Sequence, residues 1–205
     1  MKKTFYIIDD HEMLRTGTSS YITSNSDWEC AGLSATQGEA LDDFARLSQS
    51  GEFPSVIISD LNFYGANTGI DFISEVRSLY PEAKIIVYTM FFAMGIVQRA
   101  VQNGANGYIS KNASSAELLL CMEKVLSGES FIENDLRNNF IKYNKMTDAL
   151  TKREKEMMNL ILERNTNEEI AKILGIKKTA VENYVSRIYE KIDVKDRTEL
   201  IERFG

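Results

Sequence analysis

The chain has 205 residues, which exceeds the usual length of one domain and predicts two domains of unequal size. Its 24 Lys and Arg against 30 Asp and Glu give a net charge of −6, typical of a water-soluble globular protein, and no run approaches the roughly 18 apolar residues of a membrane helix. The Met-Lys-Lys start leads into a strand pattern and not into a signal-peptide core, so we expect a cytoplasmic protein with no membrane partner. Cys30 and Cys121 lack C-x-x-C spacing, and we expect both to be reduced thiols.

Up to residue 127, short apolar or β-branched runs alternate with segments of helical period. This is the βαβ pattern of a parallel sheet with helices on both faces. The predicted fold class is therefore α/β, with a doubly wound five-stranded parallel sheet and a second, smaller domain. The predicted elements are strands at 4–8, 28–34, 55–59, 84–89 and 107–110, and helices at 12–24, 37–49, 70–79, 93–102 and 115–127. Capping boxes, Thr36 with Glu39 and Ser114 with Glu117, mark two of the helix starts.

Charged or polar side chains end four of these apolar runs. Asp9 and Asp10 follow the first run, Asp60 the third, Thr89 ends the fourth and Lys111 follows the fifth. Ligands of a doubly wound sheet bind outside the carboxyl ends of its strands, so we expect these five side chains to converge. Three carboxylates together require a hard cation such as Mg²⁺, which prefers oxygen ligands and often shares phosphate oxygens. Because the hydroxyl of Thr89 and the ammonium of Lys111 are suitable donors to those oxygens, the pattern predicts a phosphoryl-accepting pocket.

These residues resemble the receiver domain of bacterial two-component response regulators, and the run Ile-Ile-Asp-Asp-His-Glu-Met-Leu-Arg at 7–15 is similar to the NarL/FixJ subfamily. The resemblance covers residues 1–127 and implies a flavodoxin-like receiver that takes a phosphoryl group from a cognate sensor histidine kinase. The functional residues that it implies are Asp60 as phosphoacceptor, Asp9, Asp10, Asp60 and the backbone carbonyl of Asn62 as Mg²⁺ ligands, Lys111 as phosphate partner, and Thr89 and Tyr108 as the switch pair. Phosphorylation would draw Thr89 toward the phosphate and let Tyr108 move inward.

Residues 128–147 are polar and rich in Asn around a few apolar positions, and we expect an interdomain linker with a short helix. From 148 to 205 the apolar residues recur only with helical period, which predicts a small all-α domain of four short helices. Two of these helices should start with capping boxes at Thr151–Glu154 and Thr166–Glu169, and Gly175 should form the turn before the third.

Three segments of this region resemble the LuxR-type helix-turn-helix domain: Leu-Thr-Lys-Arg-Glu from Leu150, Asn-Glu-Glu-Ile-Ala from Asn167 and Lys-Ile-Asp-Val from Lys191. The resemblance implies a transcription regulator whose partner is double-stranded DNA. Its third helix, from about Lys178 to Lys191, would be the recognition helix in the major groove of DNA. We expect a homodimer, whose formation is either constitutive or dependent on phosphorylation. The expected DNA-contacting residues are Lys177, Lys178, Thr179, Glu182, Asn183, Ser186, Arg187 and Lys191.

The expected recognition helix departs from the LuxR pattern at four positions. Lys177 replaces the usual Ser at the helix cap, Ala180 replaces Thr, Glu182 replaces Lys, and Tyr184 replaces His. Loss of a cap hydroxyl typically costs about 1 kcal/mol, although Thr179 with Glu182 would form a displaced capping box and start the helix later. Glu182 would either repel DNA phosphates or accept a hydrogen bond from cytosine N4.

Three observations keep open an alternative, in which the C-terminal domain binds a protein partner or binds DNA independently of phosphorylation. Residues 146–205 carry 12 basic and 12 acidic side chains, whereas a DNA-binding domain usually has a basic surface. The loop after Asp60 is one residue longer than usual and has Tyr64 where Pro is common. Met90 follows Thr89 where a small residue is usual, and its side chain would crowd the phosphoryl site.

An enzyme function is not expected. His11 is the only histidine, no G-x-S-x-G motif accompanies it, and we expect it to be a helix-start residue. A phosphatase with an aspartate nucleophile would need a second Asp two residues after Asp60, where Asn62 stands. The remaining chemistry is self-phosphorylation of Asp60 and slow hydrolysis of the acyl phosphate.

Overall fold

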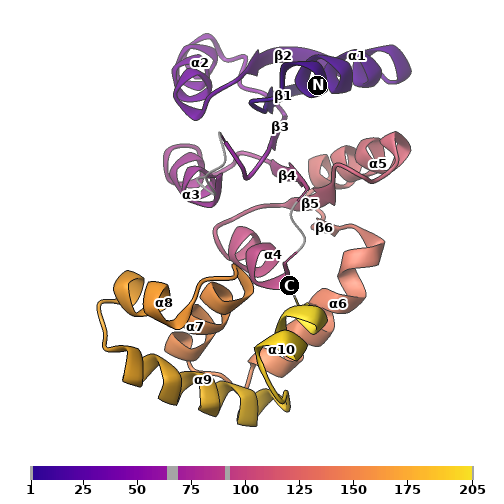
Figure 1. The fold of residues 1–205 in the computed structure, drawn as a ribbon. Helices are drawn as coiled ribbons and strands as arrows, with labels where there is room; N and C mark the ends of the chain where they lie inside the picture. Colours follow the sequence, from indigo (N-terminus) through magenta and orange to yellow (C-terminus); the bar gives the residue numbers. More distant parts are fainter. Residues whose placement is uncertain (1, 64–68, 91–92, 205) are drawn as a thin grey trace. The chain divides into compact units, whose positions relative to one another are not determined.

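The structure is a computed structural model that describes residues 2–63, 69–90 and 93–204; the loop position Tyr64 lies outside them. The chain divides into two compact units, which we describe separately (Figure 1). The first unit comprises residues 1–91 and 99–133, and the second comprises 92–98 and 134–205. Among the described residues, no helix combines the length and the apolar composition that a membrane crossing requires.

A single parallel sheet forms the centre of the first unit, with the strand order β2-β1-β3-β4-β5-β6. Its strands are β1 Thr4–Ile8, β2 Glu29–Ser34, β3 Val56–Ser59, β4 Ile85–Thr89, β5 Gly107–Ser110 and β6 Phe131–Ile132. β1 pairs with both β2 and β3, so the strand order reverses beside β1. Such a reversal opens a crevice at the carboxyl ends of the strands, here between β1 and β3.

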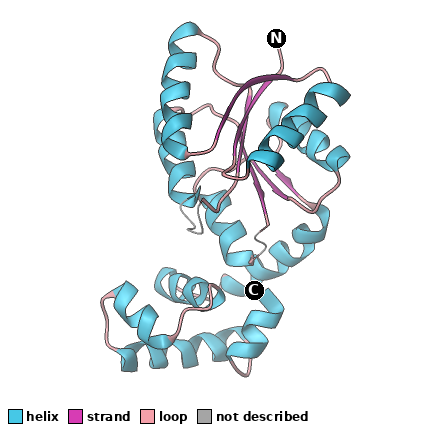
Figure 2. Ribbon diagram, turned by 45° about the horizontal axis from the view of Figure 1, so that its top comes forward, coloured by secondary structure: helices cyan, strands magenta, loops and turns pink. Residues whose placement is uncertain are grey.

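Helices cover both faces of this sheet (Figures 1 and 2). Their bounds are α1 Glu12–Asn25, α2 Gln37–Ser50, α3 Gly69–Leu79 and α5 Ser115–Leu126. On one face, Ile22 of α1 and Met122 of α5 join the strand residues Ile7 and Ile58 in a buried apolar cluster. On the other face, the ring of Phe44 from α2 packs edge-on against the Tyr6 ring, with 5.0 Å between the ring centroids. The doubly wound fold is therefore confirmed.

The sheet has a sixth strand, which the five-strand prediction missed. β6 pairs in parallel with β5, with Phe131 opposite Gly107 and Ile132 opposite Tyr108. Two residues are too few to display a strand periodicity, which explains why the sequence pattern did not reveal it. The rest of the expected linker is mostly a 14-residue helix, α6 Asn134–Thr147, which belongs to the second unit.

The second unit is helical. Its helices are α6, α7 Lys152–Leu162, α8 Asn167–Leu174, α9 Lys178–Ile192 and α10 Arg197–Phe204, together with the first part of α4 Met94–Gln102. The expected bundle of four helices is thus joined by α6, whose Tyr143 is fully buried. The Tyr143 hydroxyl donates to Asn159 Oδ1 of α7 at 2.8 Å, and its ring lies 5.8 Å from the ring of Phe204. These contacts hold α6 in the second unit.

The helix starts of the second unit mostly follow the predicted caps. The capping boxes at Thr151 and Thr166 both form, and Gly175 ends α8 in the left-handed conformation, with φ of 63°. α9, in contrast, starts at Lys178, with Lys177 as an N-cap that makes no side-chain hydrogen bond. The helix therefore starts at Lys178, as expected, and the alternative of a later start at a displaced capping box of Thr179 and Glu182 is not realised.

Candidate functional site

The acidic residues meet at the carboxyl ends of β1 and β3. Asp9 and Asp10 follow β1, and Asp60 follows β3. The parallel ladder continues one residue past each strand, because the Asp60 amide donates to Ile8 O at 3.0 Å and the Asp9 amide donates to Ser34 O at 3.2 Å. These backbone bonds bring the carboxylates together, and the side chains of Asp9 and Asp60 are only 2% and 6% exposed.

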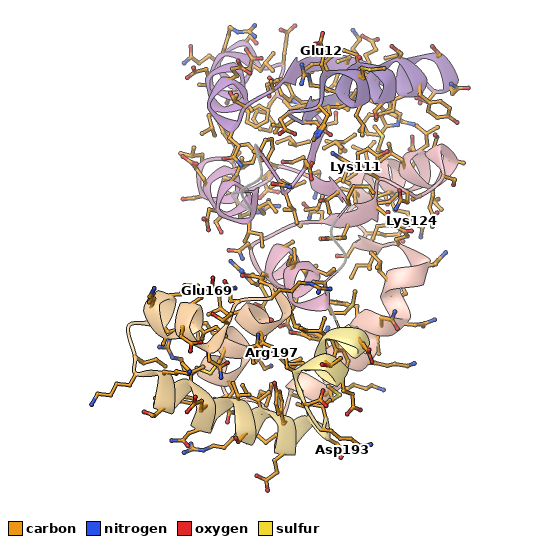
Figure 3. All side chains as sticks on the ribbon, in the orientation of Figure 1. Glu12, Lys111, Lys124, Glu169, Asp193 and Arg197 are labelled. Atoms are coloured by element: carbon orange, nitrogen blue, oxygen red, sulfur yellow. The ribbon has the colours of Figure 1, made fainter. Side chains whose placement is uncertain are left out.

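Lys111, which follows β5, lies between two of these carboxylates. Its ammonium nitrogen is 2.7 Å from Asp9 Oδ2 and 2.7 Å from Asp60 Oδ2, and its side chain is 4% exposed. Lys111 is labelled in Figure 3. Burial alone would lower the pKa of Lys111, but the hydrogen bonds to Asp60 and Asp9 raise it above the ordinary value overall. Lys111 therefore carries a firmly held positive charge in the pocket.

The Asp60 carboxylate is oriented by its own loop. Its Oδ1 accepts the backbone N–H groups of Leu61 at 2.6 Å and Asn62 at 3.3 Å, and its Oδ2 faces Lys111. Gly69 packs so closely on this loop that a Cβ atom there would lie 2.4 Å from the Leu61 Cα. A larger side chain at Gly69 would displace the loop that orients Asp60.

Oxygen and nitrogen ligands for a metal ion cluster in the same place. The cluster takes one ligand atom each from Asp9, Asp10, His11 and Asp60, and these atoms all lie within 4.8 Å of one another. His11 is the N-cap of α1, as expected of a helix-start residue, but its Nδ1 also lies 2.7 Å from Asp10 Oδ1, a contact that the sequence did not reveal. Three carboxylates fit a hard divalent cation, and the added imidazole suits a transition metal as well.

The expected switch residues, Thr89 and Tyr108, are both completely buried. Burial raises the pKa of the Tyr108 phenol far above its ordinary value, with a smaller contribution from the Asp60 charge. Tyr108 therefore already occupies an interior position in this structure, whereas we expected it to move inward after phosphorylation. Met90, next to Thr89, is 52% exposed, and much of its side chain faces solvent.

The expected DNA-contacting residues of the second unit all lie on the surface. Val181, Val185, Ile188 and Ile192 form the buried face of α9. The exposed residues are Lys177, Lys178, Thr179, Glu182, Asn183, Ser186, Arg187 and Lys191. One face of α9 thus offers charged and hydrogen-bonding side chains along its length.

Several of these charged side chains already have partners within the second unit. Lys178 forms an ion pair with Glu168 of α8, and lies 3.9 Å from Glu182 one turn further along α9. The guanidinium of Arg187 lies 5.7 Å from the centroid of the Tyr184 ring, a cation–π geometry. Tyr184, a departure from the LuxR pattern, therefore orients Arg187.

Lys191 is engaged more strongly than the other basic residues of α9. Its ammonium is 2.7 and 2.9 Å from the two carboxylate oxygens of Glu154, whose side chain is 4% exposed. The hydrogen bond to Lys191 and then the backbone hydrogen bond from Thr151 lower the pKa of Glu154. Lys191 ties α9 to the start of α7, and this contact competes with the expected contact to DNA phosphate.

Two family models match the chain. The response regulator receiver domain matches residues 5–123, and the luxR family of bacterial regulatory proteins matches residues 148–204. Each match contains the residues that suggested it, with the acidic pocket in the first and α9 in the second.

Curated relatives match over nearly the whole chain. The oxygen regulatory protein NreC of Staphylococcus haemolyticus is 32% identical over 208 residues, covering 96% of this chain and 94% of that protein. The response regulator protein VraR of Staphylococcus epidermidis is 32% identical over 198 residues, covering 95% and 92%.

Solved structures share the fold. A structure of the response regulator RcsB in complex with DNA matches with a TM-score of 0.70 and 20% identity over 99% of this chain and 98% of that one. RcsB from Salmonella enterica serovar Typhimurium, bound to the promoter P1flhDC with the phosphomimetic BeF3-, matches with a TM-score of 0.71 at 20% identity, with the same coverage. The receiver pocket, the LuxR-type helices and the full-length relatives agree, and the chain belongs to the NarL/FixJ-type response regulators of two-component systems, which join a receiver domain to a LuxR-type DNA-binding domain.

Proposed function

We propose that this response regulator accepts a phosphoryl group on Asp60 from a cognate sensor histidine kinase. The observation that carries the proposal is the Lys111 ammonium, which lies 2.7 Å from both the Asp9 and the Asp60 carboxylates in a buried pocket. A cation at this point is suited to the phosphoryl oxygens that arrive at Asp60.

The two oxygens of the Asp60 carboxylate have different surroundings. Oδ1 is held by the Leu61 and Asn62 amides, which leaves Oδ2, on the Lys111 side, as the nucleophile. Attack of Oδ2 on phosphorus forms the acyl phosphate, while the leaving group of the donor departs with the electron pair of the broken bond. Lys111 then exchanges its contact with Asp60 for one with a phosphoryl oxygen.

The pocket fits Mg²⁺, which Asp9, Asp10, Asp60 and the backbone carbonyl of Asn62 would hold. When bound, the ion supplies positive charge that neutralises the phosphoryl oxygens. The chain's own residues supply the nucleophile, its orientation and one fixed ammonium. We propose no separate enzymatic activity beyond this self-phosphorylation and slow hydrolysis of the acyl phosphate.

Phosphorylation is tested by intact-mass measurement of the full chain with Mg²⁺ and acetyl phosphate. We expect the wild type to gain one phosphoryl group and Asp60→Asn to gain none. Asp71→Asn, which removes a carboxylate from the start of α3, serves as the matched control and should gain the group as the wild type does. Equal incorporation in the wild type and in Asp60→Asn would refute the assignment of Asp60.

For the output, we propose that the exposed face of α9 reads double-stranded DNA, as one half of a homodimer on two half-sites. Support comes from the exposure of Glu182, Asn183, Ser186 and Arg187, which are able to hydrogen-bond base edges. One of the similar solved structures contains two RcsB dimers bound to two parallel DNAs. Thr89 and Tyr108 are proposed to transmit the phosphorylation state to dimer formation.

DNA binding is tested by titration of genomic and random DNA at two salt concentrations, with and without phosphorylation. We expect log affinity to fall linearly with log salt, because phosphate contacts release counterions. Sizing of both forms gives the oligomeric state. No detectable binding of either form to any DNA would favour the alternative, in which the second unit binds a protein partner.

A further inference from the structure

At the end of β5, just before Lys111, a side chain accepts the backbone hydrogen bond that a neighbouring strand would otherwise accept. Along the β5–β6 ladder the Phe131 amide donates to Asn106 O at 3.0 Å, and the Glu133 amide donates to Tyr108 O at 3.1 Å. In a regular parallel ladder, the next N–H of β5 on this side, that of Ser110, would meet the main-chain carbonyl of residue 133. Instead, the chain turns into α6 at Asn134, and the Ser110 amide donates to Glu133 Oε2 at 2.7 Å.

This hydrogen bond lies in the interior of the first unit. Ser110 is 4% exposed and Glu133 is 8% exposed. A buried amide that loses its acceptor is costly, and it tends to shift its backbone until it finds another. The Glu133 carboxylate therefore fixes the backbone position of Ser110.

The same short segment is held from its other side as well. The Lys111 amide donates to Thr89 O at 2.9 Å, and the Asn112 amide donates to the Ser110 hydroxyl at 2.8 Å. The backbone that carries the Lys111 side chain is thus fixed between β4 on one side and Glu133 on the other. This double support keeps the ammonium within 2.7 Å of two carboxylates at once.

We infer that Glu133 is a positioning residue for phosphoryl transfer: its carboxylate holds Ser110, and through Ser110 it holds the Lys111 ammonium over Asp60. The inference rests on the proposed phosphorylation of Asp60. It adds a residue that lies outside the metal cluster and directly precedes α6.

The test compares Glu133→Ala, which removes the acceptor, with Glu133→Gln, which keeps an amide oxygen that is able to accept from Ser110. Glu129→Ala is the matched control, because Glu129 is an exposed carboxylate whose partner is Lys124 on the surface. The rate constant for phosphorylation by acetyl phosphate with Mg²⁺ is measured by intact mass. Hydrogen exchange of the Ser110 amide is followed by NMR in the same full-length proteins.

We expect Glu133→Ala to be phosphorylated about tenfold more slowly than the wild type, the lower end of the effects seen when an outer-shell residue that orients a metal ligand is removed. Hydrogen exchange of the Ser110 amide should become faster in Glu133→Ala only. For Glu133→Gln and Glu129→Ala, we expect both the phosphorylation rate and the amide exchange rate to stay within about twofold of the wild type. The inference would be overturned if a folded Glu133→Ala were phosphorylated at the wild-type rate, or if Glu133→Gln were phosphorylated as slowly as Glu133→Ala. Either result would leave the proposed phosphorylation of Asp60 intact. Failure of the wild type to take any phosphoryl group would refute the proposed function and this inference with it.

Discussion

The receiver pocket and the exposed face of α9 use charged residues in opposite ways. In the pocket, Asp9, Asp60 and Lys111 are almost fully buried, and the single ammonium serves two carboxylates at 2.7 Å each. On α9, the side chains of Lys178 and Glu182 are each 50% exposed and lie 3.9 Å apart. Buried charges are fixed by one geometry, whereas exposed charges exchange partners at little cost.

This difference affects how each region meets a ligand. A phosphoryl group that enters the pocket finds Lys111 already in place, so little reorganisation precedes its binding. If α9 contacts DNA as proposed, a DNA phosphate has to compete with Glu168 for Lys178 and with Glu154 for Lys191. The pocket is thus preorganised for a phosphoryl group, whereas the charges on the proposed DNA-binding face of α9 are in part neutralised within the second unit.

Replacement of Lys111 should have the largest effect on stability, and a small effect would contradict the contrast between the buried pocket and the exposed face of α9. Lys111→Met leaves two buried carboxylates without their shared cation, which should lower the free energy of unfolding by about 3–5 kcal/mol without divalent metal. Mg²⁺ should restore more stability to this variant than to the wild type, because it supplies the missing charge. Thermal melts with and without Mg²⁺ measure both effects, with Lys84→Met at the start of β4 as control. An identical Mg²⁺ response in the two proteins would contradict the preorganised pocket.

The ion pair between Glu154 and Lys191 lies in the second unit, but, like the ion pairs of the pocket, it should contribute measurably to stability. We expect Glu154→Gln to lower the free energy of unfolding by about 1.5–2 kcal/mol, the lower part of the range for a hydrogen bond to a charged group, because solvent screens the partly exposed Lys191. The folded-state pKa of Glu154 lies below its ordinary value of 4.5. The contribution of Glu154 to stability is therefore complete above pH 4.5, and it disappears as the pH falls through the folded-state pKa. Urea unfolding between pH 3 and 7 measures this, and Lys191→Met should flatten the pH dependence. A Lys191→Met variant with the wild-type pH dependence would show that the pair does not set it.

Glu182 distinguishes between specific readout and plain repulsion on the α9 face. If Glu182 reads cytosine, as we expect, Glu182→Lys should cost roughly 1–3 kcal/mol at the cognate site and relax specificity there. If it only repels phosphates, the same change should raise affinity for all sequences and steepen the salt dependence. DNA titrations at two salt concentrations distinguish between these two outcomes. Arg187→Ala, at another proposed base-contacting residue, is measured in parallel. Glu190→Lys, an exposed acidic residue near the other end of α9, controls for charge alone.

Met90 should give the smallest effect. We expect Met90→Ala to accelerate phosphorylation and dephosphorylation by only about twofold, because half of the side chain faces solvent and access is limited only in part. Rates from acetyl phosphate labelling and from loss of label measure the change. No change in either rate would show that the Met90 side chain does not narrow the approach to Asp60.

Much of the receiver pocket was predictable because each of its residues directly follows, or ends, an apolar strand run. The order of Asp9, Asp60 and Lys111 along the chain, with the rule that parallel strands share their carboxyl ends, was enough to bring them together. The contact between His11 and Asp10 was not predictable, since it depends on the orientation of a surface ring. Glu133 was missed for a different reason: it acts through a hydrogen bond to Ser110, 23 residues away in sequence.

The second unit shows where local sequence signals fail. Thr179 and Glu182 have the spacing of a capping box, but α9 starts one residue before Thr179 because the buried face from Val181 to Ile192 sets its position. The Asn-rich composition of residues 128–147 predicted a linker with a short helix, whereas most of this segment is the 14-residue helix α6, which Tyr143 anchors in the second unit. In both places packing within the unit outweighed the local pattern.

The short strand β6 also determines where the receiver can be cut from the rest of the chain. A fragment that stops at residue 127, where the sequence suggested a boundary, would lack β6 and leave the backbone of β5 as an open sheet edge. Open edges pair readily with other chains, so such a fragment is expected to self-associate. A fragment that extends through Glu133 is longer, keeps β5 paired with β6 and retains the acceptor for Ser110, so we expect it to be a monomeric, phosphorylatable receiver.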